Sequence, residues 1–441
     1  MLVGSWRLGV NGWSFVRISG DPYHLGFQHG HLLTDEIRHA IAAKKLHVEK
    51  VCKRDWQFFR DTAMTLYWPR IPEEYREEME GIAEGVKVKG VSDIDLSDIV
   101  ALNGFEDTLS YHHWLRGKEV PAVPQTARED HCSAFIATGD ATRDGGILVA
   151  HNTWSSYLTG TSNIIMDLSP AKGKRFLMQT GPGVISSGTD WFVGASGLVI
   201  TETTISGMKT FNPDATPYFI RARKAVQYGN SIDEWIKLMV ADNNGGYANE
   251  WLLGDVRTSE IARLELGTFN YSIDRTLDGA FAGSNVARSE KVRLETKFNY
   301  NEPGSCTARR QRWDELIKSN RSRLNVEMAK SFLADHHDAV SGENSPNRNT
   351  LCGHLDLDGR GAPEWEVGPY CPIGAHDGKV TTSELASKGE FWAHWGKPCG
   401  MDFNSASFLS LHPEYGWQQS QLRDIKACPW TLFQGPGWNL N

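Results

Sequence analysis

Residues 130–138 read Asp-His-Cys-Ser-Ala-Phe-Ile-Ala-Thr, and the fold is organised around this stretch. From Cys132 onwards the residues are small or apolar, and alternate side chains would fall on opposite faces of a strand. A turn rich in Gly and Asp follows at residues 139–146, and a second apolar segment occupies residues 147–152. Two short segments around such a turn are typical of a β-hairpin. The sequence therefore predicts a hairpin that begins at a cysteine.

The predicted hairpin follows a Pro-rich, charged loop at residues 117–130. A cysteine at the head of a strand, behind a loop that can be cut, is the layout of an N-terminal-nucleophile hydrolase. In such an enzyme the thiolate attacks a carbonyl, while the α-amine, with a pKa of about 8, takes and returns the proton. Before cleavage the Cys132 thiol would attack the carbonyl of His131, and water would open the resulting ester-like intermediate. The alternative is a buried structural cysteine, since free Cys is among the most buried residue types.

Length and composition are those of an ordinary globular protein. The chain has 441 residues, which is enough for one large domain or two closely associated ones. Its net charge is −8 with both signs interspersed, so we expect no nucleic acid partner. No run approaches the ~20 apolar residues of a membrane span, so we expect no such span.

The cellular compartment stays open at this stage. Residues 1–7 lack a charged segment followed by an apolar one, so we expect no signal peptide. Read as given, the chain would be cytoplasmic; a mature or truncated N-terminus would instead allow a secreted or lysosomal location. The seven cysteines are odd in number, and those in the last third permit disulfides without requiring them.

Apolar spacing predicts that the first hundred residues are mainly helical. A helix is expected to begin at Asp21 and Pro22, with an apolar stripe that continues to Ile41. Gly26 and Gly30, one turn apart on it, would let another backbone approach closely. Further helices are expected at residues 72–83, 93–103, 216–228, 232–240, 307–317 and 326–333.

After Cys132 the sequence becomes rich in short β segments. Gly and Asp turns separate them, which favours stacked antiparallel sheets. The expected strands are residues 163–168, 175–179, 198–204, 251–254, 261–266 and 280–282. The Gly- and Pro-rich residues 341–377 are too long for a plain connector, so we expect them to be ordered over a site or a surface.

The change in composition at residues 117–131 predicts the main boundary of the chain. Residues 1–131 would form a mainly helical α-chain, and residues 132–441 a β-rich catalytic β-chain, packed together as one unit. The apolar stripes of the first part predict that the two fragments stay associated after cleavage, because separation would expose a large hydrophobic surface.

Several segments resemble the phospholipase B-like family, within the N-terminal-nucleophile hydrolases related to isopenicillin-N acyltransferase. These segments are residues 20–23, 26–30, 132–134, 150–154, 197–204, 309–312, 351–354 and 377–383, of which Ala-His-Asn-Thr-Trp at 150–154 is the most specific. The resemblance implies an α+β fold, the αββα sandwich in which helices flank two stacked antiparallel sheets. It also implies self-cleavage between His131 and Cys132, and hydrolysis of an acyl-amide or acyl-ester bond in a small acyl-amide or lipid-like substrate.

The resemblance assigns roles to the hairpin residues. It makes Cys132 the nucleophile and sets His151 where related bile-salt hydrolases have an arginine near the nucleophile. Asn152 follows it, as in those relatives. Trp154 stands where they have an aspartate that contacts the α-amine, so the partner of the amine stays open. The alternative is a purely structural role, in which His151 and Asn152 only form hydrogen bonds with buried polar groups at the end of a strand.

Four further positions are carried over from the same relatives. Thr203 or Thr204 falls where an oxyanion donor is expected, and Asn285 where an active-site asparagine is expected. Arg309 matches a structural or substrate-orienting arginine more weakly. On propensity alone, the threonines are ordinary strand residues, Asn285 is a turn residue and Arg309 lies on an exposed helix face.

Three groups of residues have side chains of the kinds that bind metals. They are residues 335–338 (Asp-His-His-Asp), the pair Cys352 and His354, and the pair Cys371 and His376. None has the spacing of a zinc motif, so we expect neither a metal nor another cofactor.

Two other functions compete with hydrolysis. One is acyl transfer to an amine, as in isopenicillin-N acyltransferase, and the other is a binding protein with a degenerate site, which Trp154 favours. The chain contains no Gly-x-Ser-x-Gly motif, which counts against a serine α/β-hydrolase.

Overall fold

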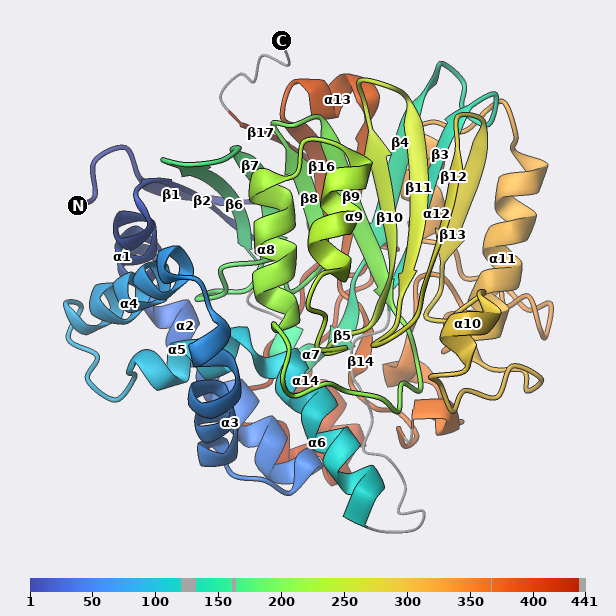
Figure 1. Ribbon diagram of the computed structural model, residues 1–441. Coiled ribbons are helices and arrows are strands. Elements are labelled where there is room, and N and C mark those ends of the chain that lie inside the picture. Colours follow the sequence, from blue (N-terminus) through green and yellow to red (C-terminus); the bar gives the residue numbers. More distant parts are fainter. Residues whose placement is uncertain (120–131, 161–163, 366, 436–441) are drawn as a thin grey trace. The chain divides into compact units, whose positions relative to one another are not determined.

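The computed structural model describes residues 1–119, 132–160, 164–365 and 367–435 (Figure 1). The chain divides into two compact units. Unit 1 comprises residues 1–121, 162–196 and 210–247, and unit 2 comprises residues 122–161, 197–209 and 248–441. In the described ranges, no helix combines the length and the apolar character that crossing a membrane requires. The predicted α- and β-chains stay a prediction, and most of the linker, with His131, lies outside the described residues.

Unit 1 combines a sheet with helices. Its strands follow the order β1-β2-β6-β7-β8; β2 and β6 are parallel, and the pairs β1–β2, β6–β7 and β7–β8 are antiparallel. The strands are β1 (Trp6–Val10), β2 (Trp13–Gly20), β6 (Ile164–Pro170), β7 (Phe176–Thr180) and β8 (Trp191–Gly194). The α-helices are α1 (Pro22–Leu32), α2 (Thr34–His47), α3 (Trp56–Thr62), α4 (Glu73–Lys87), α5 (Leu96–Asn103), α6 (Phe105–Glu119), α8 (Tyr218–Tyr228) and α9 (Ile232–Val240).

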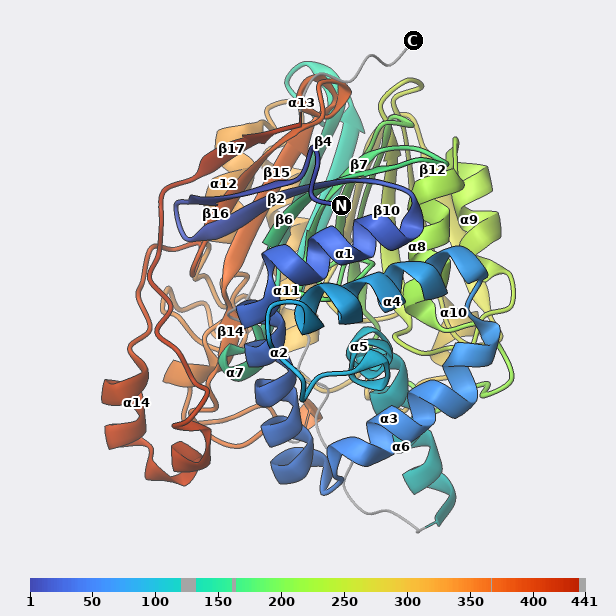
Figure 2. The same cartoon turned by 90° about the vertical axis from the view of Figure 1, so that its left-hand side faces the viewer.

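Helices α1 and α4 lie side by side (Figure 2). Their contact is built on glycines, Gly26 and Gly30 from α1 and Gly81 and Gly85 from α4. A Cβ atom on Gly26 would lie 1.7 Å from the carbonyl oxygen of Glu78, so only a hydrogen atom fits there. The expected close approach at Gly26 and Gly30 is confirmed.

The first hundred residues are mainly helical, as expected, but one strand pair was not predicted and one expectation is wrong. A hairpin, β1 and β2, precedes the first helix; Asn11 (φ 45°) and Gly12 (φ 85°) form the turn, as a two-residue hairpin turn requires. The apolar stripe to Ile41 is also divided between two helices, because Leu33 leaves helical geometry with φ −125° and ψ 23°. Spacing alone detects the stripe but not this break in the backbone.

Unit 2 contains two larger sheets and a short strand pair. One sheet has the order β13-β3-β4-β15-β16-β17 and is called the hairpin sheet below; the other includes β9-β10-β11-β12. The strands are β3 (Ser133–Gly139), β4 (Gly145–Asn152), β5 (Trp154–Ser156), β9 (Leu198–Thr204), β10 (Asn249–Asp255), β11 (Glu260–Leu266), β12 (Tyr271–Thr276), β13 (Gly279–Gly283), β14 (Ile373–Ala375), β15 (Asp377–Thr382), β16 (Glu390–Trp395) and β17 (Thr431–Gln434). The predicted hairpin is confirmed as the antiparallel pair β3 and β4.

The helices of unit 2 are mostly short. They are α7 (Tyr157–Gly160), α10 (Glu290–Arg293), α11 (Ser305–Ser319), α12 (Val326–Leu333), α13 (Ser383–Ser387) and α14 (Ser405–Leu411). The expected helices at residues 216–228, 232–240, 307–317 and 326–333 agree with α8, α9, α11 and α12 to within two residues.

The two sheets of unit 2 are stacked, and helices cover the outer face of the hairpin sheet. A Cβ atom on Gly254 of β10 would meet Ile136 of β3 and Ile147 of β4, each at 3.1 Å, so β10 packs directly on the hairpin. On the opposite face, Phe135 packs against Trp313 of α11, with ring centroids 5.1 Å apart, inside a larger apolar cluster with α12. In unit 1, α8 packs against β8. The expected α+β class with stacked sheets flanked by helices is confirmed.

The glycine contact between α1 and α4 gives a direct stability test. We expect Gly26→Ala to lower the free energy of unfolding by about 3 kcal/mol, since the added methyl group must push backbone apart. Gly9→Ala is the control, because a Cβ atom there has nothing within 4 Å. Equal thermal unfolding midpoints for the two variants would contradict the contact.

Candidate active site

Cys132 lies directly before β3 and is buried, with a relative exposure of 1%. In the hairpin sheet, Ala134 pairs with His151, and His151 pairs with Lys379 of β15. Because side chains alternate along a strand and paired residues share a face, Cys132 lies on the same face as His151 and Lys379. This face points towards the stacked sheet of unit 2.

A buried ion pair lies on this same face. The Nζ atom of Lys379 lies 3.0 Å from Oδ1 of Asp377 and donates to the hydroxyl of Thr153 at 2.7 Å. The backbone N–H of Thr153 donates to the same Asp377 carboxylate at 2.9 Å. Asp377 lies two positions before Lys379 on β15, and Thr153 lies two positions after His151. Asp377 and Thr153 therefore lie side by side on the same face, next to Cys132.

Sequence reasoning gave Asp377 and Lys379 no role, although both lie in a segment that carries the family resemblance. The sequence feature that could have identified them is a pair of opposite charges two positions apart on one strand. Side chains at such positions point to the same face of the sheet. Buried charges are tolerated where they are paired and hydrogen-bonded, as these two are.

His151 is fully buried, and no side chain among the described residues makes a hydrogen bond with either ring nitrogen. Burial lowers the pKa of His151 well below its ordinary value, and the Lys379 ammonium lowers it further. His151 is therefore neutral at neutral pH.

Asn152 pairs with Ser133 and so lies on the opposite face of the sheet from Cys132. Its Oδ1 atom accepts the backbone N–H of Ser133 at 3.1 Å, and its Nδ2 atom donates to the carbonyl of Leu351 at 2.9 Å and that of Leu333 at 3.3 Å. Asn152 thereby holds the backbone beside Cys132.

Arg309 of α11 is fully buried, so the expectation of an exposed helix face is wrong. Its Nη1 atom donates to the carbonyl oxygen of Cys132 at 2.7 Å and to Oγ of Ser133 at 3.0 Å. Its Nη2 atom donates to Oδ1 of Asn285 at 2.9 Å. The guanidinium also lies over the ring of Trp154, 4.4 Å from its centroid. Arg309 therefore connects two of the predicted site positions, Cys132 and Asn285.

The two candidate threonines differ in direction. A Cβ atom on Gly283 of β13 would lie 2.4 Å from Oγ1 of Thr203, and Gly283 pairs with Ala134. Thr203 therefore points at the face that carries Cys132, whereas its neighbour Thr204 points away from it. The carbonyl of Thr204 accepts from Nδ2 of Asn285 at 2.8 Å. Of the two, Thr203 is the better placed to act near the thiol.

Glu250 was not singled out by the sequence. It pairs with Thr203 across β9 and β10 and is fully buried. Burial raises the pKa of Glu250 to about 8, against the opposing effect of the Arg263 guanidinium, whose Nη1 atom lies 3.6 Å from the carboxyl group. A carboxyl group that is mostly protonated near neutral pH thus faces the hairpin sheet.

Comparisons with known proteins agree on one family. The family model described as Phospholipase B matches residues 35–270, more than half of the chain. A phospholipase B from Crotalus adamanteus is 24% identical over 354 residues, which cover 70% of this chain and 60% of that protein. Phospholipase B-like protein F from Dictyostelium discoideum is 28% identical over 170 residues, 36% of this chain and 30% of that one.

Two further similarities lie outside these named relatives. An uncharacterised protein from Archaeoglobus fulgidus is 26% identical over 269 residues, 57% of this chain and 42% of that one. The chain thus spans less than two thirds of the length of these relatives. Two variants of the conjugated bile acid hydrolase from Clostridium perfringens are 10% identical, with TM-scores of 0.34 and 0.35; they cover 59% and 69% of this chain and 88% and 98% of their own.

The raised pKa of Glu250 predicts a pH-dependent stability. Between its ordinary pKa of 4.5 and the folded value of about 8, the folded state binds the proton more tightly than the unfolded state, so stability falls as pH rises. Glu250→Gln removes this loss, and we expect it to gain on the order of 3 kcal/mol relative to the natural chain between pH 5 and pH 8. Denaturant unfolding at several pH values measures the gain. The exposed Glu302→Gln is the control, and an equal slope in both variants would contradict the assignment.

Proposed function

The chain belongs to the phospholipase B family, and we propose that it is a self-cleaving hydrolase of acyl-amide or acyl-ester bonds with Cys132 as its nucleophile. The observation that carries the proposal is the face of the hairpin sheet shared by Cys132, His151 and the buried pair Asp377 and Lys379. Polar groups that converge around a nucleophile in a buried place are the usual mark of a catalytic site.

Activation would begin at the bond between His131 and Cys132. The Cys132 thiol attacks the carbonyl carbon of His131, the peptide C–N bond breaks, and the acyl group passes from nitrogen to sulfur. Water then hydrolyses this thioester, which leaves the carboxylate of His131 and a cysteine with a free thiol and a free α-amine. His131 lies outside the described residues, and Cys132 is the first described residue after it.

The free amine would take the proton of the thiol during attack on a substrate and return it to the leaving group. Trp154 stands in place of the expected aspartate, and its indole nitrogen donates to the carbonyl of Leu351 at 3.1 Å. We assign the role of the missing carboxylate to Asp377, acting with Thr153. If the register of β3 and β4 continues by one residue, Thr153 lies opposite Cys132. Asp377 lies on the next strand, β15, and neighbouring strands are about 4.8 Å apart.

The remaining positions fall into two groups. His151 shares the face of Cys132, and Thr203 points at that face from the stacked sheet; both are the proposed groups near the developing oxyanion. Arg309, Asn152 and Asn285 act as positioning residues, because they bond to backbone and to one another around the start of β3. For Arg309 this replaces the expected contact with substrate.

The first test is the fate of the chain when Cys132 is changed. We expect the natural chain to give two fragments by intact-mass analysis, the second beginning at Cys132, and Cys132→Ala to stay in one piece with activity at least ~10³-fold lower. Cys428→Ala, a half-buried cysteine elsewhere in unit 2, is the control and should behave as the natural chain does.

Two results would overturn the proposal. One is cleavage at residues 131 and 132 in Cys132→Ala, and the other is a natural chain that stays uncut and resists alkylation at Cys132. Matched amide and ester substrates with the same acyl group then give the bond preference. Added hydroxylamine distinguishes hydrolysis from acyl transfer, since a transferase diverts most of the product into the hydroxamate.

The proposed amine partner predicts opposite pH shifts in two variants. The Asp377 carboxylate favours a protonated amine and the Lys379 ammonium disfavours it. Asp377→Asn should therefore move the acidic limb of the kcat/KM profile to lower pH, and Lys379→Met should move it to higher pH. Loss of activity without these opposite shifts would show that the pair is only structural.

A further inference from the structure

A second cluster of reactive side chains lies in unit 2, apart from the residues of the candidate active site. It consists of His336, Cys352, His354 and Cys399, whose ligand atoms all lie within 4.8 Å of one another. Cys352 and His354 are buried, and His336 and Cys399 are half-buried. None of these four residues has a role in the proposed hydrolysis.

Three of the distances within the cluster are close to the edges of a tetrahedral metal site. Nε2 of His354 lies 3.2 Å from Nε2 of His336, and 3.5 Å from the sulfur atoms of both Cys352 and Cys399. Zinc binds nitrogen at about 2.0–2.1 Å and sulfur at about 2.3 Å. A tetrahedron with these bond lengths has edges of about 3.3 Å between two nitrogens and about 3.6 Å between nitrogen and sulfur.

We propose that His336, Cys352, His354 and Cys399 bind one zinc ion. Both cysteines would lose their protons to solvent and bind as thiolates, and both histidines would bind as neutral imidazoles through Nε2. Two thiolates balance the charge of Zn²⁺, so the complete site is neutral and its burial carries little electrostatic cost. Two sulfur and two nitrogen ligands are a set that selects zinc over calcium or magnesium, which prefer oxygen.

The site would be structural, because protein atoms fill all four positions. Its ligands come from three separate segments. His336 follows α12, Cys352 and His354 lie in the long irregular segment before β14, and Cys399 follows β16. A metal ion would therefore tie together parts of the chain that no continuous helix or strand connects.

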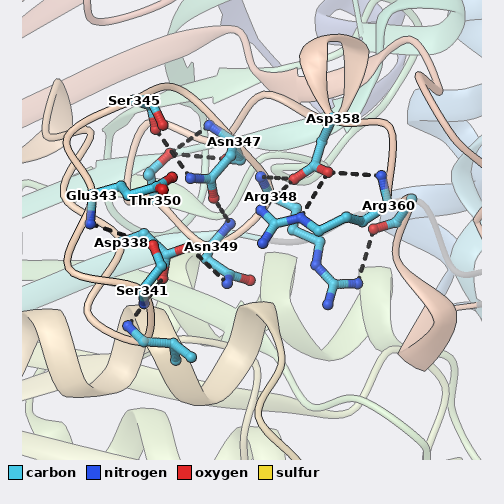
Figure 3. Close-up of polar contacts among 12 residues, drawn as sticks. Asp338, Ser341, Glu343, Ser345, Asn347, Arg348, Asn349, Thr350, Asp358 and Arg360 are labelled. Carbon is cyan, nitrogen blue, oxygen red and sulfur yellow. Dashed lines mark hydrogen bonds and ion pairs between the residues drawn. The ribbon is translucent and has the colours of Figure 1, made fainter.

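The stretch from Asp338 to Arg360, which carries Cys352 and His354, is held in shape by its own polar contacts (Figure 3). Asp338 accepts from the backbone N–H of Val340 and from Nδ2 of Asn349, both at 3.0 Å. Asp358 accepts the backbone N–H of Arg348 at 3.0 Å and binds the guanidinium of Arg360. These contacts lie before and after Cys352 and His354 in the sequence. They fix the backbone on both sides of the two residues and so preorganise them as ligands.

A lysine and a carboxylate lie beside the second ring nitrogen of His354. When Nε2 binds the metal, the proton resides on Nδ1, which lies 3.7 Å from the carboxylate of Asp356. Lys397 lies 2.6 Å from the same carboxylate and 3.4 Å from Nδ1.

Metal analysis of the purified full-length chain tests the proposal. We expect about one zinc per chain after refilling with Zn²⁺ and removal of excess. Cys352→Ser and Cys399→Ser should each lose most of it, whereas the matched control Cys371→Ser, a half-buried cysteine outside the cluster, should keep it. Chelation should lower the thermal unfolding midpoint of the natural chain by several degrees, and zinc should restore it.

Cobalt substitution keeps the test decisive if the cysteine variants fail to fold. The natural chain filled with Co²⁺ should show thiolate-to-cobalt charge-transfer bands and the intense visible bands of a tetrahedral ion. Absence of both bands, or a chain that binds no zinc after reduction and refilling, would overturn the proposal. So would a disulfide between Cys352 and Cys399, seen as a mass lower by two hydrogens, that persists in the freshly purified chain.

Discussion

The buried guanidinium of Arg309 is the interaction on which the geometry around Cys132 depends. It bonds to the carbonyl of Cys132, to the hydroxyl of Ser133 and to the amide of Asn285, and it lies over the ring of Trp154. Hydrogen bonds to charged groups contribute about 1.5–3 kcal/mol each, and a buried acceptor that loses its donor costs a similar amount. One side chain of α11 thus holds the start of β3 against the sheet.

The same region connects the hairpin to the cysteine and histidine cluster. Asn152 accepts the backbone N–H of Ser133 and donates to the carbonyl of Leu351, the residue before Cys352. The backbone N–H of Cys352 in turn donates to the carbonyl of Asp335 at 3.1 Å. A zinc ion at Cys352 would therefore fix a backbone that takes part in positioning the nucleophile, without contacting it. The stability of this part of the fold and the positioning of the nucleophile would then depend on the same hydrogen bonds.

The sequence predicted well the features that depend on local spacing. The hairpin at Cys132, the helices α9 and α12, and the close approach at Gly26 and Gly30 each follow from neighbouring residues. It missed the features that depend on distant segments. Cys399 lies 45 positions after His354, so these residues do not form a zinc motif of short spacing in the sequence. In the folded chain, however, the Cys399 sulfur and Nε2 of His354 lie 3.5 Å apart. Likewise, Glu250 becomes notable only because burial raises its pKa.

Trp154 has a packing role in unit 2, at the position where the resemblance implies an aspartate. The ring of Trp154 packs against Gly353, where a Cβ atom would lie 1.9 Å from the indole. The other contact of the ring is with the guanidinium of Arg309. A carboxylate at this position could do neither. Asp377 on β15 lies on the face that carries Cys132, so it can supply negative charge beside the proposed nucleophile. In the proposed mechanism, the packing role and the charge role are thus divided between two strands.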